Sequence, residues 1–169
     1  MRPRFTITNR IAMLTLVLAC AAVTFARLGE THTELEKRFG KPSVRYPAEI
    51  TTQGKRVKIG ETEIFRQDDW LITAILISNK CVSLAYGKQG DFTAEQIQKL
   101  ITSNAQGNGW VEDVKQSNST RRVWLRFDGT KATFERLSRT LQFVTPAYIA
   151  HVKSVEEAEK RRAAKLPEF

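Results

Sequence analysis

Cysteine and histidine are scarce in this chain of 169 residues, which contains two of each. Two cysteines exclude the disulfide-dense frameworks that hold very small secreted domains together, and two histidines exclude most histidine-rich metal sites. The motifs Cys-x-x-Cys and His-Glu-x-x-His and the EF-hand loop are also missing. We therefore predict no metal ligands and no cofactor.

Motifs of nucleophilic catalysis are missing as well. Neither a Gly-x-Ser-x-Gly elbow nor a Ser-x-x-Lys motif occurs. His32 falls in the first turn of an expected helix and His151 in a later one, where we expect surface or edge positions. No catalytic residue is predicted, although a serine and a histidine that are distant in sequence could still meet in the fold.

The formal charge is +9, from 27 Lys and Arg against 18 Asp and Glu. The excess is spread evenly, with +3 over residues 27–90, +2 over 91–145 and +1 over 146–169. Proteins that bind nucleic acid gather their positive charge into a patch. We therefore predict a solvated basic surface and no nucleic-acid partner, with weak contact to an anionic lipid or cell-wall polymer as an alternative.

Residues 1–26 have the parts of a secretory signal peptide. Arg2, Arg4 and Arg10 form a basic start, and an uncharged, mostly apolar run over 11–26 follows. We expect cleavage after Ala26, with cleavage after Ala22 as the second choice. An uncleaved anchor formed by residues 11–26 and a lipoprotein modified at Cys20 are the alternatives, although Leu18 is large for a lipobox. The predicted location is periplasmic or extracellular.

The rest of the chain predicts an α+β domain over 27–150, made of two units over about 27–90 and 91–145. Capping boxes at Thr31-His32-Thr33-Glu34 and Thr93-Ala94-Glu95-Gln96 each begin a short helix. Antiparallel meanders are expected after both helices, and the shared plan suggests a tandem repeat. The expected strands cover residues 43–48, 63–66, 70–77, 81–86, 110–115, 122–127, 131–136 and 140–144.

A last helix is expected over residues 146–169, where Thr145-Pro146 supplies the cap and the first turn. Tyr148, Ile149, Val152 and Val155 form its apolar stripe, and a charged, fraying tail follows them. If Cys20 leaves with the signal peptide, Cys81 is the one remaining cysteine. Its apolar neighbours predict a buried, inert thiol.

The opening of the first unit resembles small exported bacterial proteins. Gly29, Thr31, Leu35, Phe39, Gly40 and Pro42 form the pattern Gly-x-Thr, helix, aromatic-Gly-x-Pro. It is similar to the SmpA/OmlA type of outer-membrane-assembly lipoprotein module and to the β-lactamase-inhibitory-protein fold, which carries two helix-plus-meander repeats. The resemblance covers residues 28–42 and implies no binding residues for this chain.

Trp124 is the candidate anchor for a partner. It lies on an alternating segment, with Val123 and Leu125 pointing to one face and Arg122, Trp124 and Arg126 to the other. Exposed aromatic residues with flanking arginines are common in interfaces, although core packing is an alternative for every tryptophan here. We predict an exported, non-enzymatic interaction module that binds an envelope protein. An exported hydrolase with an unrecognised site is the alternative.

Overall fold

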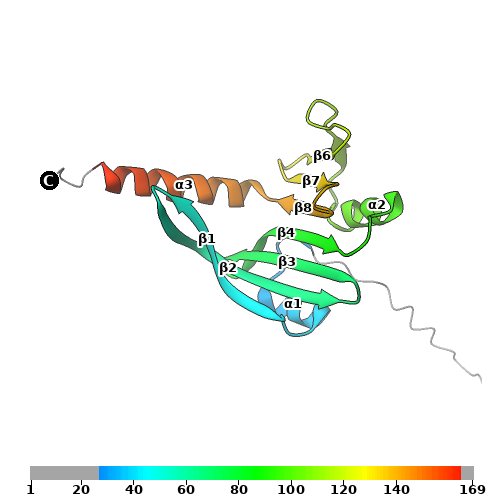
Figure 1. Cartoon of the computed structure of the whole chain (residues 1–169), viewed down its shortest axis with the longest axis horizontal. Helices are drawn as coiled ribbons and strands as arrows, with labels where there is room; N and C mark the ends of the chain where they lie inside the picture. The colour runs from blue at the N-terminus through cyan, green and yellow to red at the C-terminus, as the bar shows by residue number, and fades with distance from the viewer. Residues whose placement is uncertain (1–26, 165–169) are drawn as a thin grey trace, which may run out of the picture.

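In the computed structural model, which describes residues 27–164, each of the first two helices is followed by four strands and a third helix comes last (Figure 1). The fold is therefore α+β. The helices are α1 (His32–Phe39), α2 (Ala94–Ser103) and α3 (Pro146–Ala163). The strands are β1 (Val44–Thr52), β2 (Lys55–Gln67), β3 (Trp70–Ile77), β4 (Lys80–Lys88), β5 (Trp110–Glu112), β6 (Arg121–Arg126), β7 (Lys131–Glu135) and β8 (Thr140–Val144).

Side-chain caps begin α1 and α2. The Thr31 hydroxyl accepts from the backbone N–H of Glu34 at 3.4 Å, and the Glu34 carboxylate accepts from the backbone N–H of Thr31 at 2.7 Å. Thr93 and Gln96 make the same two bonds at 3.1 and 3.0 Å. Both predicted capping boxes are confirmed, because each satisfies N–H groups that have no partner inside the helix.

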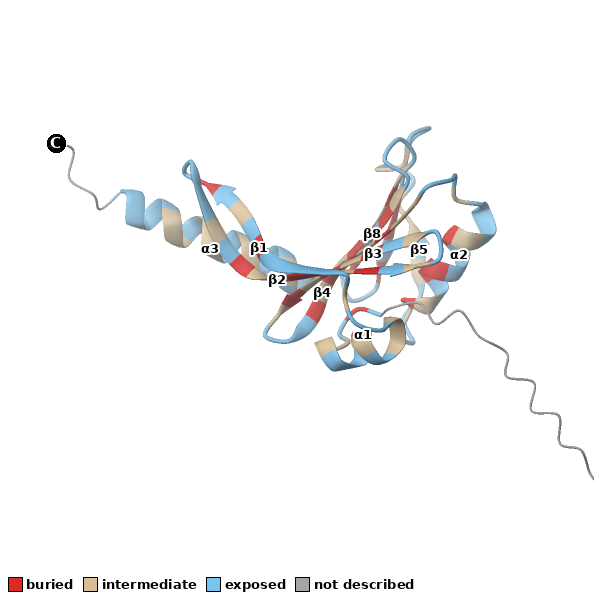
Figure 2. Cartoon of the chain, turned by 60° about the horizontal axis from the view of Figure 1, so that its bottom comes forward, coloured by how far each residue is buried: buried red, intermediate tan, exposed pale blue. Residues whose placement is uncertain are grey.

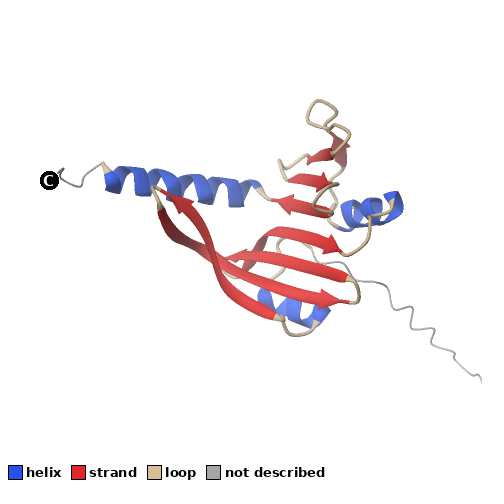
Figure 3. Cartoon of the chain, in the orientation of Figure 1, coloured by secondary structure: helices blue, strands red, loops and turns tan. Residues whose placement is uncertain are grey.

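The strands form one antiparallel sheet with the order β1-β2-β3-β4-β8-β7-β6-β5 (Figure 3). β1–β4 and β5–β8 are each a meander, and the two meanders join where β4 pairs with β8. The strands predicted at 70–77 and 140–144 have the predicted bounds, whereas the brief strand predicted at 63–66 is part of the 13-residue β2.

The long β1–β2 hairpin was underestimated because its outer half is polar. Lys55, Arg56 and Lys58 give no alternation of apolar residues, yet they pair with β1 beyond a turn at Gln53 and Gly54. Gly60 lies where this half begins, and a Cβ atom there would lie 2.3 Å from the Leu76 carbonyl oxygen. A glycine is therefore required at this position for β2 to approach β3.

One face of the sheet carries the hydrophobic core (Figure 2). Leu35 of α1 and Leu100 of α2 are fully buried in the same cluster as Leu84 and Phe143 of the strands. Both helices therefore cover this face, which we call the core face; the other is called the open face. The strand pairing places one row of residues on the core face: Glu63, Ala74, Leu84, Phe143, Ala132 and Trp124.

Helix α3 begins as predicted, with the Thr145 hydroxyl accepting from the backbone N–H of Tyr148 at 3.2 Å. The helix contacts β1, β2 and β4, and a ring nitrogen of His151 lies 3.1 Å from the Ile59 carbonyl oxygen of β2. Of the predicted apolar stripe, Tyr148, Val152 and Val155 are half-buried, whereas Ile149 is 51% exposed. None of the helices within residues 27–164 is long and apolar enough to cross a membrane.

Cys81 is buried, as predicted, with 1% of its surface exposed. Burial is the largest cause of the raised pKa of its thiol, which disfavours the reactive thiolate at neutral pH. The predicted signal peptide over residues 1–26 and the last five residues of the predicted tail lie outside the described residues.

Candidate functional site

Trp124 is buried, not exposed as an interface anchor would be. Its indole belongs to the core cluster, with 6% of its surface exposed. The alternation of β6 was predicted correctly, but the row of Trp124 lies on the core face, beneath α2. Trp124 therefore takes the alternative of core packing, and its burial does not favour the partner-binding role predicted for this side chain.

Arg126 is buried as well, at 5% exposure, and is held inside the protein by four hydrogen bonds. Its guanidinium donates to the Asn104 carbonyl oxygen at 2.6 Å, to both carboxylate oxygens of Asp128 at 2.9 and 2.6 Å and to the Thr130 hydroxyl at 3.0 Å. The two bonds from Arg126, and after them hydrogen bonds from Thr130, hold the pKa of Asp128 well below its usual range. The structure gives Arg126 a structural role, because a buried cation with four hydrogen bonds is held in place by them, and this burial does not favour the predicted partner-binding role.

Arg122 is the one residue of the predicted trio that stays at the surface. Its guanidinium carbon lies 4.7 Å from the centre of the Trp124 ring, in a cation–π contact. It also donates to both carboxylate oxygens of Glu112, at 3.0 and 2.6 Å. Arg122 thus covers the tryptophan and remains available to a ligand from its solvent side.

Exposed apolar residues lie on the open face instead, at the β5–β6 end of the sheet. Val111 of β5 lies directly opposite Leu125 of β6, and the two are 58% and 39% exposed. Phe127, which follows Leu125 in the same alternating row just beyond β6, is 80% exposed. We call Val111, Leu125 and Phe127 the apolar strip. Leu125 and Phe127 belong to the alternating row of β6 that also holds Val123, and Val123 itself is fully buried.

β5 is also a free edge of the sheet. The N–H of Asp113 donates to the Val123 carbonyl oxygen at 2.8 Å, and Val111 lies opposite Leu125. Hydrogen-bonded pairs alternate along an antiparallel ladder. The backbone groups of Val111 therefore point toward β6, while those of Trp110 and Glu112 point outward at the edge.

The opposite edge of the sheet, formed by β1, is better protected against pairing with an added strand. β1 carries Pro47, which has no N–H to donate, and its pairing shifts by one residue between Ala48 and Glu49. Proline and β-bulges are devices by which natural sheets discourage an added strand. β5 has neither a proline nor a bulge, and its only defence of this kind is its length of three residues. An added strand could pair there through the outward groups of Trp110 and Glu112.

A second cluster surrounds His32, beside a cavity of about 580 Å³. The imidazole Nδ1 lies 2.8 Å from a carboxylate oxygen of Glu63, and Nε2 lies 3.3 Å from one of Glu36. Arg45 lies 2.9 Å from the same Glu63 oxygen. The same guanidinium lies 2.9 Å from each ring nitrogen of His32, so both nitrogens already have charged neighbours within the cluster. We interpret this cluster as an ion network that joins α1 to β1 and β2.

A scan against protein-family models finds none that matches the chain, and a search of curated proteins finds no match either. Among solved structures, the chain is similar to a cysteine-rich secretory protein from Staphylococcus aureus, with 10% identity, a TM-score of 0.40 and coverage of 73% of this chain and 46% of that one. It is also similar to an extracellular protein containing an SCP domain from Bacillus anthracis, with 8% identity, a TM-score of 0.38 and coverage of 89% and 52%.

The chain thus spans about half the length of these two structures. Neither is an outer-membrane-assembly lipoprotein or a β-lactamase-inhibitory protein, so that resemblance stays a prediction. At these identities and TM-scores the likenesses carry no argument about function.

Proposed function

We propose that this protein is an exported, non-enzymatic binding module of the cell envelope that takes up an extended segment of a partner protein at β5. The observation that carries the proposal is the apolar strip beside a sheet edge that has neither a proline nor a bulge. An added strand would pair with the outward backbone groups of Trp110 and Glu112, and every second side chain of it would lie toward Val111, Leu125 and Phe127. This is recognition by strand addition, in which the main chain supplies affinity and alternate side chains supply specificity.

Charge indicates which partner segment fits. Lys131 of β7 lies directly opposite Leu125 on the open face, and Lys115 lies in the turn that follows β5. Neither lysine makes an ion pair in the part of the chain that the structure describes. Removal of residues 1–26 takes away three arginines and no acid, so the formal charge falls from +9 to +6. A segment with apolar residues on one face and acidic residues around them therefore complements this edge.

The test is a photo-crosslinker placed at position 127, in cells that express the protein. Substitution of Phe127 by p-benzoyl-phenylalanine should give one discrete adduct with another protein. Mass spectrometry should locate the crosslink in an extended apolar and acidic segment. Val111→Lys should abolish this adduct, because it places a charge in the centre of the strip while the 58% exposed side chain costs the fold little.

The matched control is the same crosslinker at position 137, in the β7–β8 turn. Leu137 is 88% exposed but lies away from β5 in the sheet order. Equal adducts from both positions, or an adduct that survives Val111→Lys, would contradict a docking site at the strip. An adduct with a second copy of this chain would assign the edge to self-association and overturn the partner proposal.

The exported location rests on the sequence pattern of residues 1–26, and the first described residues support cleavage after Ala26. The backbone N–H of Arg27 lies 3.0 Å from a carboxylate oxygen of Glu30. Cleavage after Ala26 converts this group to an α-ammonium, which pairs more strongly with a carboxylate than a neutral amide does. The Glu30 carboxylate would therefore stabilise a new N-terminus at Arg27.

We expect the protein recovered from outside the cytoplasm to have an intact mass that begins at Arg27. Substitution of Ala26 by leucine should slow processing, because the residue before the cleaved bond must be small. A mass that retains residues 23–26 would instead indicate cleavage after Ala22. A mass that retains residues 1–26 would indicate the membrane anchor and contradict release.

We also infer that the two units, α1 with β1–β4 and α2 with β5–β8, are a tandem repeat. The support is their shared order of elements and the way in which the last strand of each unit, β4 and β8, pairs with the other. This arrangement is what the resemblance to the β-lactamase-inhibitory-protein fold implies. It leaves β1 and β5, the first strand of each unit, as the two edges of the sheet.

A further inference from the structure

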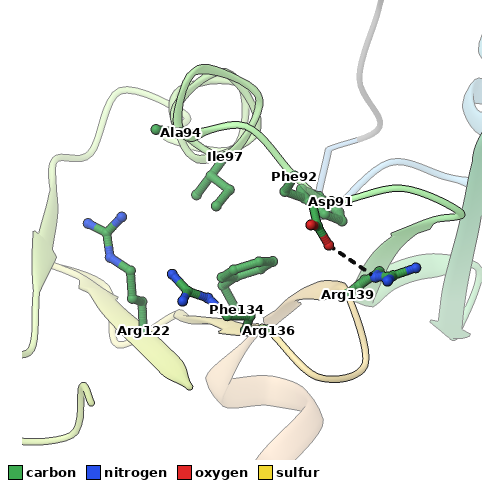
Figure 4. Close-up of a pocket in the computed structure, with 8 residues that line it drawn as sticks. All are labelled: Asp91, Phe92, Ala94, Ile97, Arg122, Phe134, Arg136 and Arg139. Carbon is green, nitrogen blue, oxygen red and sulfur yellow. Dashed lines mark ion pairs between the residues drawn. The ribbon is translucent and has the colours of Figure 1, made fainter. Parts of the chain in front are cut away.

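A cavity of about 370 Å³ lies on the core face, between the start of α2 on one side and β6, β7 and the β7–β8 turn on the other (Figure 4). This volume is in the range of sites for small organic molecules. Its apolar wall is made by Phe92, Ile97 and Phe134, and the Phe92 and Phe134 rings pack 5.3 Å apart. Ile97 and Phe134 are 6% and 8% exposed, so the wall is part of the packed core and is formed before any ligand binds.

Three arginines surround this apolar wall, and two of them already have carboxylate partners. Arg122 is bonded to Glu112, as described above, and Arg139 pairs with Asp91 at 3.1 Å. Figure 4 shows Arg122 and Arg136 on one side of the cavity and the Arg139–Asp91 pair on the other. The charges at the cavity therefore sum to one unpaired positive charge.

Arg136 carries that charge. Its backbone N–H donates to the Thr120 carbonyl oxygen at 2.8 Å, which fixes the residue at the end of β7. Its guanidinium has no hydrogen bond and no ion pair within residues 27–164. A guanidinium presents a planar fork of donors that matches a carboxylate with two parallel bonds. This fork lies beside the apolar wall, so an anion bound to it would place an attached apolar group against Phe134.

We propose that this cavity binds a small organic carboxylate that carries an aromatic or branched apolar group. One unpaired cation favours a monoanion, whereas a phosphate ester carries a charge of about −1.5 to −2 at pH 7. The site lies on the opposite face of the sheet from the apolar strip and does not depend on the proposed partner. The two proposals can therefore fail separately.

The experiment titrates the purified protein with N-acetyl-L-phenylalanine and follows backbone amide chemical shifts. Saturable shifts are expected around the cavity, at the start of α2 and the end of β7. N-acetyl-phenylalaninamide lacks the charge and acetate lacks the ring, so each should bind about fivefold or more weakly. Equal binding of the amide, or an absence of saturable shifts with all three compounds, would overturn the proposal.

Two substitutions at the cavity have opposite expected effects. Arg136→Gln removes the unpaired cation and should weaken binding of N-acetyl-L-phenylalanine about fivefold or more. Asp91→Asn removes the carboxylate that competes for Arg139 and should strengthen binding about twofold or more. Such a gain separates a binding role from a structural one, because a merely damaged fold would weaken binding in both variants.

The matched control is Arg56→Gln, which removes one positive charge from the β1–β2 hairpin. The Arg56 side chain is 82% exposed and lies far along the sheet from the cavity. It should leave binding unchanged, and an equal loss in this variant would show that only net charge matters, which contradicts a site at Arg136. Tighter binding of phenyl phosphate than of the carboxylate would overturn the assigned ligand class.

Discussion

Replacement of Trp124 by alanine should lower the free energy of unfolding by about 3–5 kcal/mol. The indole is 6% exposed and shares the core cluster with Ala132 of β7 and Phe143 of β8. Its removal leaves a cavity beneath α2 and takes away the ring on which the Arg122 guanidinium rests. Urea unfolding at 25 °C should show the loss as a lower midpoint with an unchanged m-value.

Phe127→Ala is the matched control, because this aromatic residue follows β6 on the open face and is 80% exposed. It should change the free energy of unfolding by no more than about 0.5 kcal/mol. The opposite ranking, with Phe127 costly and Trp124 nearly neutral, would mean that the two faces of β6 are reversed. The same pair of variants also separates fold from function, because only Phe127 belongs to the proposed docking strip.

Local chemistry in the sequence was sufficient to predict the helix starts. A capping box is set by residues three apart, so Thr31 with Glu34 and Thr93 with Gln96 identify their own helices without reference to the rest of the chain. The apolar β3 and the compact β8 were predicted with their observed bounds for a similar reason. The polar half of β2 was not, because its pairing with β1 depends on the hairpin and not on its own composition.

The orientation of β6 is a long-range property. Alternation shows which residues share a face, but not which face α2 covers. Val123, Leu125 and Phe127 are the apolar row, and an apolar row normally faces the core. Here the core side takes Arg126, because Asn104, Asp128 and Thr130 converge from α2's end and the β6–β7 turn to satisfy its guanidinium. Those partners could not be recognised before the fold had placed them.

The arginine cavity could not be predicted from the sequence, because it too depends on how distant segments pack together. The cavity takes Arg122 from β6 and both Arg136 and Arg139 from the β7–β8 turn. Its apolar wall takes Phe92 from just before α2, Ile97 from the start of α2 and Phe134 from β7. No spacing in the sequence relates these segments. Arg122 was singled out as a flank of Trp124, and the structure keeps it at the surface, next to that cavity.

Arg126→Met should cost about 3 kcal/mol or more, because it removes a buried cation and leaves its partners unsatisfied. The Asn104 carbonyl oxygen lies inside the protein, and its bond from Arg126 is 2.6 Å long. Methionine fills a similar volume but donates nothing to that oxygen. Arg122→Met is the control, since the exposed Arg122–Glu112 pair should contribute no more than about 1 kcal/mol. Similar losses for the two variants would contradict the structural role of Arg126 and return it to the surface role that the sequence suggested.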